Sequence, residues 1–447
     1  MTAFSLEPAQ LAWCAELRTL AAERLHPLAD KGEPGHVNRA LVAELGDLGL
    51  LGRLFTSGAL DLCLMRESLA YACTEAETAL ALQGLGAHPV HAYGTEAQRA
   101  RWLPRVTAGT AVAAFALSEP GAGSDAAALK LRAKAKAKAK AKAKTEADAS
   151  QAGRSSDTAR PGSSSDTAQV DRSSHTAAPA ADRAPAADRA PAVDRAPTAD
   201  PALAADPDGR ARWRLTGEKC WISNAPEADF YTVFARTTPG AGARGVTAFL
   251  VPADRPGLTG RGLDMLSPHP IGALDFDAVP VTVDDVLGVV DRGFRVAMGT
   301  LNLFRPSVGA FAVGMAQAAL DATLAHTAGR DAFGGKLRDL QAVAHQVAEM
   351  ALRTEAARLM VHAAASAYDA DDPDVPRRSA MAKLLATETA QYVVDTAVQL
   401  HGARALQRGH LLEHLYREVR APRIYEGASE VQRGIIAKEL YARQEAR

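Results

Sequence analysis

Residues 424–433 of this chain read Ile-Tyr-Glu-Gly-Ala-Ser-Glu-Val-Gln-Arg, and they place the carboxyl group of Glu426 in a loop just before an apolar helix. Burial against apolar neighbours raises the pKa of a carboxyl group toward neutrality, which suits a general base. The adjacent Gly427 has no side chain, so another molecule can approach the backbone closely. Glu426 is therefore a candidate catalytic base. Together with three other segments, this stretch decides which fold is expected.

The overall composition indicates a globular enzyme of two or three domains. The chain has 447 residues, a formal net charge of -1 and 47% hydrophobic residues, so nothing in its charge points to nucleic acid. Its cysteines are far apart and form no C-x-x-C pair, which predicts neither a disulfide framework nor a metal site; they are Cys14, Cys63, Cys73 and Cys220. No stretch approaches the ~20 apolar residues that a membrane span needs. A cytoplasmic location, without membrane partners, is the expectation.

The pattern of apolar residues changes twice along the chain. From Leu11 to about Thr107, apolar residues recur at helical spacing, which predicts a helical domain. Between Trp213 and Val290, short runs of Val, Thr, Phe and Tyr are cut by Gly and Pro, as in the strands of a compact β domain. From Phe294 onward, long amphipathic stretches return and predict an antiparallel helical bundle; they cover 308–328, 340–367 and 379–400.

A segment from about 133 to 208 interrupts the predicted β domain and lacks residues that could build a core. It begins with six Ala-Lys pairs over 133–144 and continues in short repeats rich in Ala, Asp, Pro and Ser. Ordering such a segment costs on the order of 1 kcal/mol per residue with almost no apolar burial in return, so we expect a disordered insertion. Without it, Leu131-Arg132 would meet 213–215 in a short hairpin. The alternative is that the Ala-Lys run binds an anionic partner, such as nucleic acid or a membrane surface.

Residues 115–125, Phe-Ala-Leu-Ser-Glu-Pro-Gly-Ala-Gly-Ser-Asp, couple a strand to a glycine-rich turn whose N–H groups and hydroxyls could meet a flavin and a pyrophosphate. This segment resembles the flavin-binding signature of the acyl-CoA dehydrogenase family. The resemblance implies that the main chain at Leu117 and the Ser118 hydroxyl face the flavin, and that Ser124 lies near cofactor phosphate or substrate. The other cofactor contacts implied by this segment are Phe115 and Gly123.

Residues 215–225, Leu-Thr-Gly-Glu-Lys-Cys-Trp-Ile-Ser-Asn-Ala, resemble the second flavin segment of the same family. In that family an indole covers the ring system and a neighbouring hydroxyl points at it. The resemblance therefore assigns Trp221, Ile222 and Ser223 to FAD. Ser223 stands where Thr is common, so the hydroxyl is kept and one methyl group is lost.

Three further stretches resemble cofactor contacts near the C-terminus. Residues 330–334, Arg-Asp-Ala-Phe-Gly, resemble the segment that reaches a neighbouring subunit's cofactor, and an Arg fork suits a pyrophosphate. Residues 399–403, Gln-Leu-His-Gly-Ala, resemble the adenine-side contact, although Ala403 replaces a usual Gly. Ala428 replaces a common Thr. The cofactor residues implied here are Arg330, Phe333, Gln341, Gln399, Gly402, Ala428 and Glu430.

Substrate contacts are implied by residues 298–306, which resemble the helix that touches the carrier part of CoA. The substrate-binding residues implied by the family are Ser124, Asn302, Arg305, Tyr425 and Gly427. Residues 266–276 lack the Gly-x-Arg that often precedes the Phe-containing strand. The CoA contacts are therefore rearranged, or the acyl group arrives on a carrier protein.

The resemblance implies an α+β fold, mostly α, with an N-terminal helical domain (1–112), a central β-barrel-like domain (113–290) and a C-terminal four-helix bundle (291–447). It also implies an FAD-dependent enzyme that desaturates an acyl thioester, with Glu426 taking the α-proton. The implied partners are an electron-transfer flavoprotein and a second copy of the chain, in a homodimer or homotetramer. Two alternatives are an oxidase that passes electrons to O2, and a non-catalytic flavoprotein that binds an anionic partner through its Ala-Lys run.

Overall fold

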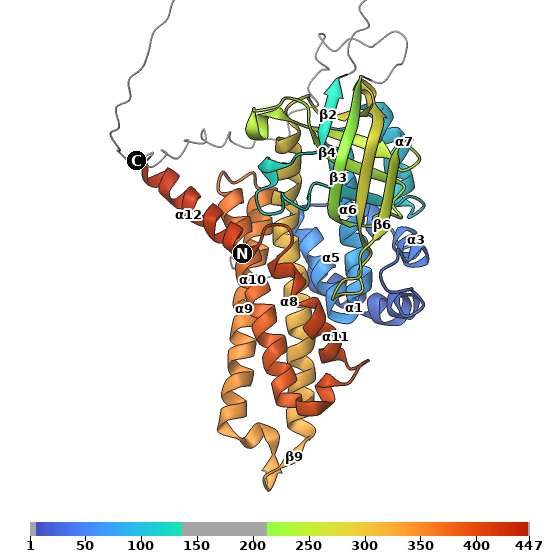
Figure 1. The fold of residues 1–447 in the computed structure, drawn as a ribbon. Helices are drawn as coiled ribbons and strands as arrows, with labels where there is room; N and C mark the ends of the chain where they lie inside the picture. The colour runs from blue at the N-terminus through green and yellow to red at the C-terminus, as the bar shows by residue number, and fades with distance from the viewer. Residues whose placement is uncertain (1–5, 136–211, 446–447) are drawn as a thin grey trace, which may run out of the picture. The chain divides into compact units, whose positions relative to one another are not determined.

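The computed structural model describes residues 6–135 and 212–445, and the fold class predicted from the sequence is confirmed (Figure 1). Helices dominate the first part of the chain. The N-terminal α-helices are α1 (Pro8–Leu20), α2 (His26–Ala29), α3 (Arg39–Asp47), α4 (Leu50–Thr56), α5 (Ala59–Ala72), α6 (Thr74–Tyr93) and α7 (Glu96–Thr107). The last of these begins at a capping box, in which Thr95 Oγ1 accepts from the Gln98 N–H and Gln98 Oε1 accepts from the Thr95 N–H.

The central part of the chain forms an eight-stranded sheet. Its strands are β1 (Ala113–Ala116), β2 (Arg132–Ala135), β3 (Trp213–Ser223), β4 (Phe230–Arg236), β5 (Val246–Pro252), β6 (Leu258–Gly262), β7 (Ile271–Val281) and β8 (Val286–Leu287). The order is β6-β7-β3-β2-β4-β5-β8, and β1 adds to β4 in parallel. Both β4 and β5 are buried almost throughout, as their near-continuous apolar sequences require.

The predicted hairpin across the insertion is present as an antiparallel pair. Arg132 pairs with Thr216 and Ala135 with Trp213, so β2 and β3 flank the interruption. The predicted start of the insertion is three residues too early, because 133–135 belong to β2 and Ala133 is buried in the core of the sheet. The rest of the predicted insertion, 136–208, lies outside the described residues.

The C-terminal part forms the predicted helical bundle. Its long helices are α8 (Gly293–Gly329), α9 (Gln341–Asp369) and α10 (Val375–His401), which run side by side in Figure 1. A short hairpin of β9 (Asp331–Ala332) and β10 (Gly335–Lys336) joins the first two. The shorter helices α11 (Leu411–Glu418) and α12 (Ser429–Glu445) pack against α10.

Helix α8 corrects one expectation from the sequence. It is long and apolar enough to cross a membrane by length and composition alone, whereas no such segment was expected. However, 72% of its most apolar window is buried inside the structure, as in the core helix of a folded domain. This helix packs against α5 as well as α9 and α10, so one hydrophobic core joins the N-terminal helices to the bundle.

Candidate active site

The loop that carries Glu426 lies between a short 3-10 turn at 421–423 and α12. Both Glu426 (φ +50°) and Gly427 (φ +96°) have left-handed backbone conformations, which are uncommon for a residue with a side chain. The surrounding structure holds this loop by its carbonyls. Lys383 Nζ donates to the Gly427 carbonyl at 2.7 Å, and Arg305 Nε donates to the Glu426 carbonyl at 3.4 Å. Gln432 Nε2 donates to both carbonyls. The strained loop is therefore fixed from three sides.

The Glu426 carboxyl group is arranged as a general base needs to be. Its Oε2 atom is buried and has no hydrogen-bond partner among the described residues. Removal from water raises the pKa of Glu426 above its usual value, although the charges of Arg66, Lys383 and Arg305 oppose the increase. A carboxylate with a raised pKa and an unoccupied oxygen can accept a proton from a neighbouring carbon acid.

Three of the charged residues around this loop were not predicted from the sequence. Arg66, Glu77 and Lys383 are almost completely buried. The only signal available was a charged residue inside an apolar helix, such as Arg66 after Leu-Cys-Leu-Met at 62–65. Burial lowers the pKa of Lys383 to about 8, and the nearby Glu426 carboxylate partly opposes that change.

Asn302 and Arg305, both predicted to contact the substrate, lie beside the Glu426 loop. Arg305 Nη1 donates to Asn302 Oδ1 at 3.1 Å, and Ser379 Oγ donates to the Asn302 carbonyl at 3.2 Å. The Arg305 side chain is buried and bound to the loop, so it supports the position of Glu426. Its contact with substrate stays a prediction.

The structure brings the two predicted flavin segments together. The Cys220 N–H donates to the Ser118 carbonyl at 3.1 Å, and Lys219 Nζ donates to the Leu117 carbonyl at 2.8 Å. Lys219 is fully buried and also pairs with Glu119 at 2.9 Å. The Glu119 carboxylate in turn accepts from the backbone N–H groups of Lys130 and Leu131. This buried network ties the glycine-rich turn to β3.

The surface of these two segments fits a flavin. Trp221 is 48% exposed and has a φ of +57°, an unusual backbone conformation that turns a large indole outward. Ser118 and Ser223 are half-buried, while Gly123 and Ser124 are exposed. An outward indole beside hydroxyls and a glycine-rich turn is suited to a planar ring with a pyrophosphate.

Two predicted cofactor residues, Ile222 and Phe115, have side chains that pack against other residues of the protein. The Ile222 side chain is buried in the core of the sheet, and the Phe115 ring packs against Phe234 with ring centroids 4.9 Å apart. Ile222 as a whole is 1% exposed, so it offers almost no surface to a ligand in this structure. The other predicted cofactor contacts near the base loop are the half-buried Ala428 and the exposed Glu430.

A third group of predicted cofactor residues gathers where α8, the β9–β10 hairpin and α10 end (Figure 1). All of them are exposed; they are Arg330, Phe333, Gln341, Gln399 and Gly402. Phe333 is 90% exposed and has a φ of +53°. Exposure of its apolar ring to water is unfavourable. Beside them, the His326 and His401 rings stack with centroids 4.1 Å apart. No hydrogen bond joins this group to Ser118, Trp221 or Ser223 within the described ranges.

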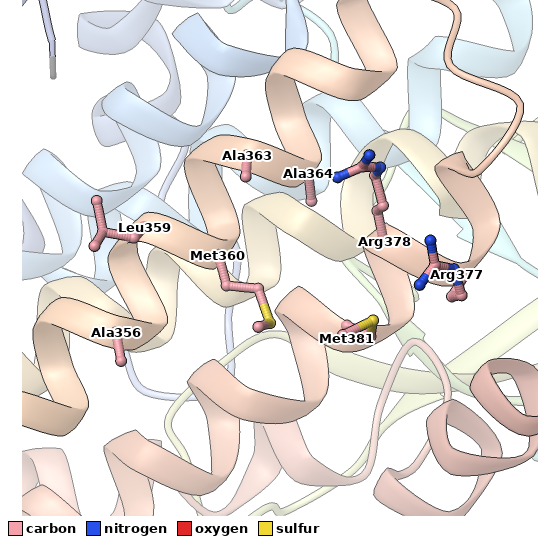
Figure 2. A pocket seen from close by; sticks show the side chains of 8 residues that line it. All are labelled: Ala356, Leu359, Met360, Ala363, Ala364, Arg377, Arg378 and Met381. Carbon is pink, nitrogen blue, oxygen red and sulfur yellow. The ribbon is translucent and has the colours of Figure 1, made fainter. Parts of the chain in front are cut away.

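Figure 2 shows a cavity elsewhere, between α9 and α10, lined mainly by alanines and by Met360 and Met381. None of the predicted site residues lines this cavity, and its charged groups, Arg377 and Arg378, sit at the start of α10. It therefore lies outside the candidate active site.

Comparisons with known proteins agree with this arrangement. The N-terminal, middle and C-terminal domains of acyl-CoA dehydrogenases match residues 7–110, 195–279 and 291–441. A probable acyl-CoA dehydrogenase of Mycobacterium tuberculosis is 38% identical over 231 residues, which are 51% of this chain and 59% of that relative's length. The short-chain specific mitochondrial acyl-CoA dehydrogenase of Bos taurus is 31% identical over 435 residues, covering 95% of this chain and 88% of the relative.

A solved structure extends the comparison to the fold. Butyryl-CoA dehydrogenase from Megasphaera elsdenii superposes with a TM-score of 0.77 at 26% identity, covering 98% of this chain and 99% of that one. The same family is indicated by the three matched domains, by the nearly full-length relative from Bos taurus and by the superposed structure. The chain belongs to the acyl-CoA dehydrogenase family of FAD-dependent oxidoreductases.

Proposed function

We propose that this protein desaturates an acyl thioester between its α and β carbons, with Glu426 as the base that removes the α-proton. The observation that supports this most directly is the Glu426 carboxyl group. It has a raised pKa and an unpartnered oxygen, on a loop held by Lys383, Arg305 and Gln432.

The reaction asks two things of the protein's own residues. Glu426 must be ionised before the reaction and must hold the α-proton afterwards, which a raised pKa favours. The substrate carbonyl must be polarised, because charge develops on its oxygen as the proton leaves. We assign that task in part to the backbone N–H of Glu426, as the family resemblance implies. When bound, FAD supplies the acceptor for the β-hydride, and Ser118, Ser124, Trp221 and Ser223 would hold it.

The test is a substitution that keeps the size of the side chain and removes its basicity. Glu426→Gln should retain FAD and bind thioester, yet reduce its flavin at least ~10²-fold more slowly under anaerobic conditions. Glu426→Asp should fall between the two, because the shorter side chain withdraws the carboxylate.

Glu439→Gln, on α12 but outside the loop, is the matched control and should keep the wild-type rate. Near wild-type flavin reduction in Glu426→Gln would show that another residue is the base. If no acyl thioester of any length bleaches the wild-type flavin, the proposed activity itself is wrong.

The electron acceptor is a separate part of the proposal. We propose an electron-transfer flavoprotein, as the family resemblance implies, rather than O2. Rapid reoxidation of the reduced protein in air would favour the oxidase alternative, whereas slow reoxidation in air with fast reoxidation by an electron-transfer flavoprotein would support the dehydrogenase.

We also propose that the protein works as a homodimer or as a tetramer of dimers. The exposed Arg330 and Phe333 support this, since a neighbouring subunit would cover an aromatic ring that is otherwise in water. In such an assembly the group at the end of the bundle would complete the cofactor site of the neighbour.

A further inference from the structure

Helix α5 places a buried cation beside the proposed base that the mechanism above does not use. Arg66 is 3% exposed and ends an apolar run. Its Nε donates to Glu77 Oε1 on α6, and its Nη1 donates to Ser307 Oγ on α8 at 2.6 Å. Its guanidinium also lies 6.0 Å from the centre of the Phe311 ring. Arg66 is thus held by three sets of contacts.

Two groups near this pair have hydrogen-bonding capacity left over. In the part of the chain that the structure describes, Arg66 Nη2 donates no hydrogen bond to protein, and Glu426 Oε2 accepts none. Arg66 therefore does not bond to the base, although its charge is the largest of those that lower the pKa of Glu426. Ser307, which Arg66 contacts, lies two residues after Arg305 on α8, and Arg305 donates to the Glu426 carbonyl, so the Arg66–Glu77 pair and the base loop contact the same turn of α8. An acyl group whose α-carbon reaches Glu426 would therefore come near Arg66.

We infer that Arg66 and Glu77 form a recognition site for an uncharged hydrogen-bond acceptor, such as a ketone or amide oxygen, on the acyl chain of the substrate. The inference rests on the proposed function, because it places the acyl α-carbon at Glu426. Arg66 Nη2 is the donor that would meet this oxygen.

A purely hydrocarbon acyl chain would fit poorly beside Arg66 and Glu77. Burying a guanidinium and a carboxylate carries a desolvation cost that their attraction must first repay, and apolar side chains of similar volume would serve a saturated chain at least as well. An apolar chain would also leave the remaining donor of Arg66 without water or a partner, which carries its own penalty.

A carboxylate on the acyl chain fits poorly for a different reason. Glu77 already balances the charge of Arg66, so a second carboxylate would be buried without a cation of its own. The other titratable groups facing this region are Tyr425, whose pKa is raised by burial and by Glu77, Glu426 itself, and the His269–Glu418 pair at 2.6 Å. The two other cations near Glu426, Arg305 and Lys383, act on the Glu426 carboxylate and donate to the carbonyls of its loop, so neither provides a separate partner for a carboxylate beside Arg66. The site favours a polar but neutral acyl chain.

The test compares three thioesters of similar shape: pentanoyl-CoA, 4-oxopentanoyl-CoA and succinyl-CoA. They place a methylene, a ketone or a carboxylate at the fourth carbon. Dissociation constants are measured by titration of Glu426→Gln, which cannot turn the ligands over. We expect 4-oxopentanoyl-CoA to bind roughly tenfold more tightly than either of the others, as expected for one hydrogen bond to a charged donor.

The variant that tests the site is Arg66→Met/Glu77→Gln in the same background, because removing both charges leaves no unpaired ion in the core. The preference for the ketone should then fall to about twofold or less. Arg66→Lys keeps the charge and loses the forked donor, and should give an intermediate preference if the double variant does not fold. The matched control is Glu67→Gln/Arg358→Met, which removes the pair between Glu67 on α5 and Arg358 on α9 and should leave the preference unchanged.

The outcomes separate the two proposals. Tightest binding of pentanoyl-CoA or succinyl-CoA, or a ketone preference that survives in Arg66→Met/Glu77→Gln, would overturn the recognition site. If those results accompany normal flavin bleaching by wild type, the dehydrogenase proposal stands and only the substrate class is wrong. A wild-type protein that binds the ketone ester selectively but never bleaches would refute the dehydrogenase proposal instead.

Discussion

Lys219→Met should destabilise the protein strongly, because Lys219 is the cation of a fully buried pair under the predicted flavin turn. Its ammonium donates to the Leu117 carbonyl at 2.8 Å and to Glu119 Oε1 at 2.9 Å. Without it, the Glu119 carboxylate stays buried with two backbone N–H donors and no counterion. Breaking a buried pair from one side costs about 3–5 kcal/mol of unfolding free energy, and we expect a loss in that range.

Removal of both charges should cost less stability than the two single changes added together. In Lys219→Met/Glu119→Gln no ion is left unpaired, so the double variant should lose at least about 1 kcal/mol less than the sum of the two single variants. The exposed pair between Arg261 and Asp275, on β6 and β7 of the same sheet, provides the control. Its side chains are more than half exposed, and Arg261→Met should cost under about 1 kcal/mol.

The measurement is urea unfolding followed by circular dichroism, with flavin fluorescence recorded in parallel to report loss of FAD. Because the pair holds the Leu117 carbonyl and the turn after it, Lys219→Met should release FAD at a lower urea concentration than wild type. A loss below about 1 kcal/mol with unchanged FAD release would refute this reasoning, since it would mean that the buried carboxylate needs no partner.

Three further predictions concern the base and the assembly. Flavin reduction at limiting substrate should fall as the pH drops through the pKa of Glu426, which burial raises above the ordinary carboxyl value, since only the ionised form accepts a proton. At a pH above that pKa, Glu426→Gln should unfold at a higher urea concentration than wild type. The reason is that a carboxyl group whose pKa is higher in the folded than in the unfolded protein destabilises the folded protein when it ionises. Equal stability of the two proteins at neutral pH would contradict this prediction. Arg330→Ala should bind FAD more weakly in an equilibrium titration, and light scattering should show a dimer or tetramer; a monomer with full FAD content would contradict this.

Much of the fold followed from the period of apolar residues. The long stretches predicted at 308–328, 340–367 and 379–400 became α8, α9 and α10. The ends of α9 and α10 differ from the predicted ends by at most four residues, whereas α8 begins at Gly293 and continues through Pro306. The sequence could not reveal that α5 joins the core of the bundle, since its buried face packs against a helix more than two hundred residues away. The strand at 132–135 was cut short for a related reason. Its Ala-Lys alternation is the same as that of the repeat after it, and only pairing with β3 distinguishes the two.

The candidate site was predictable where a local motif carried it. Glu426 and the two flavin segments could be proposed from the sequence because each is a short run with turn residues at fixed places. Arg66, Glu77 and Lys383 were missed because their roles depend on contacts between α5, α6, α8, α10 and the base loop. A buried charge in an apolar helix indicates that an oppositely charged or hydrogen-bonding partner exists, but it does not indicate where in the sequence that partner lies.

The cations around Glu426 explain how its carboxylate can be both charged and basic. Arg305 and Lys383 donate to the carbonyls of Glu426 and Gly427, while Arg66 donates to Glu77 and Ser307. None of these bonds ends on the Glu426 carboxylate. A direct salt bridge would stabilise the ionised form and lower its pKa further, which would weaken it as a base. Because the three cations act at longer range through charge alone, the Glu426 carboxylate remains available to a proton, and its pKa stays above the usual value.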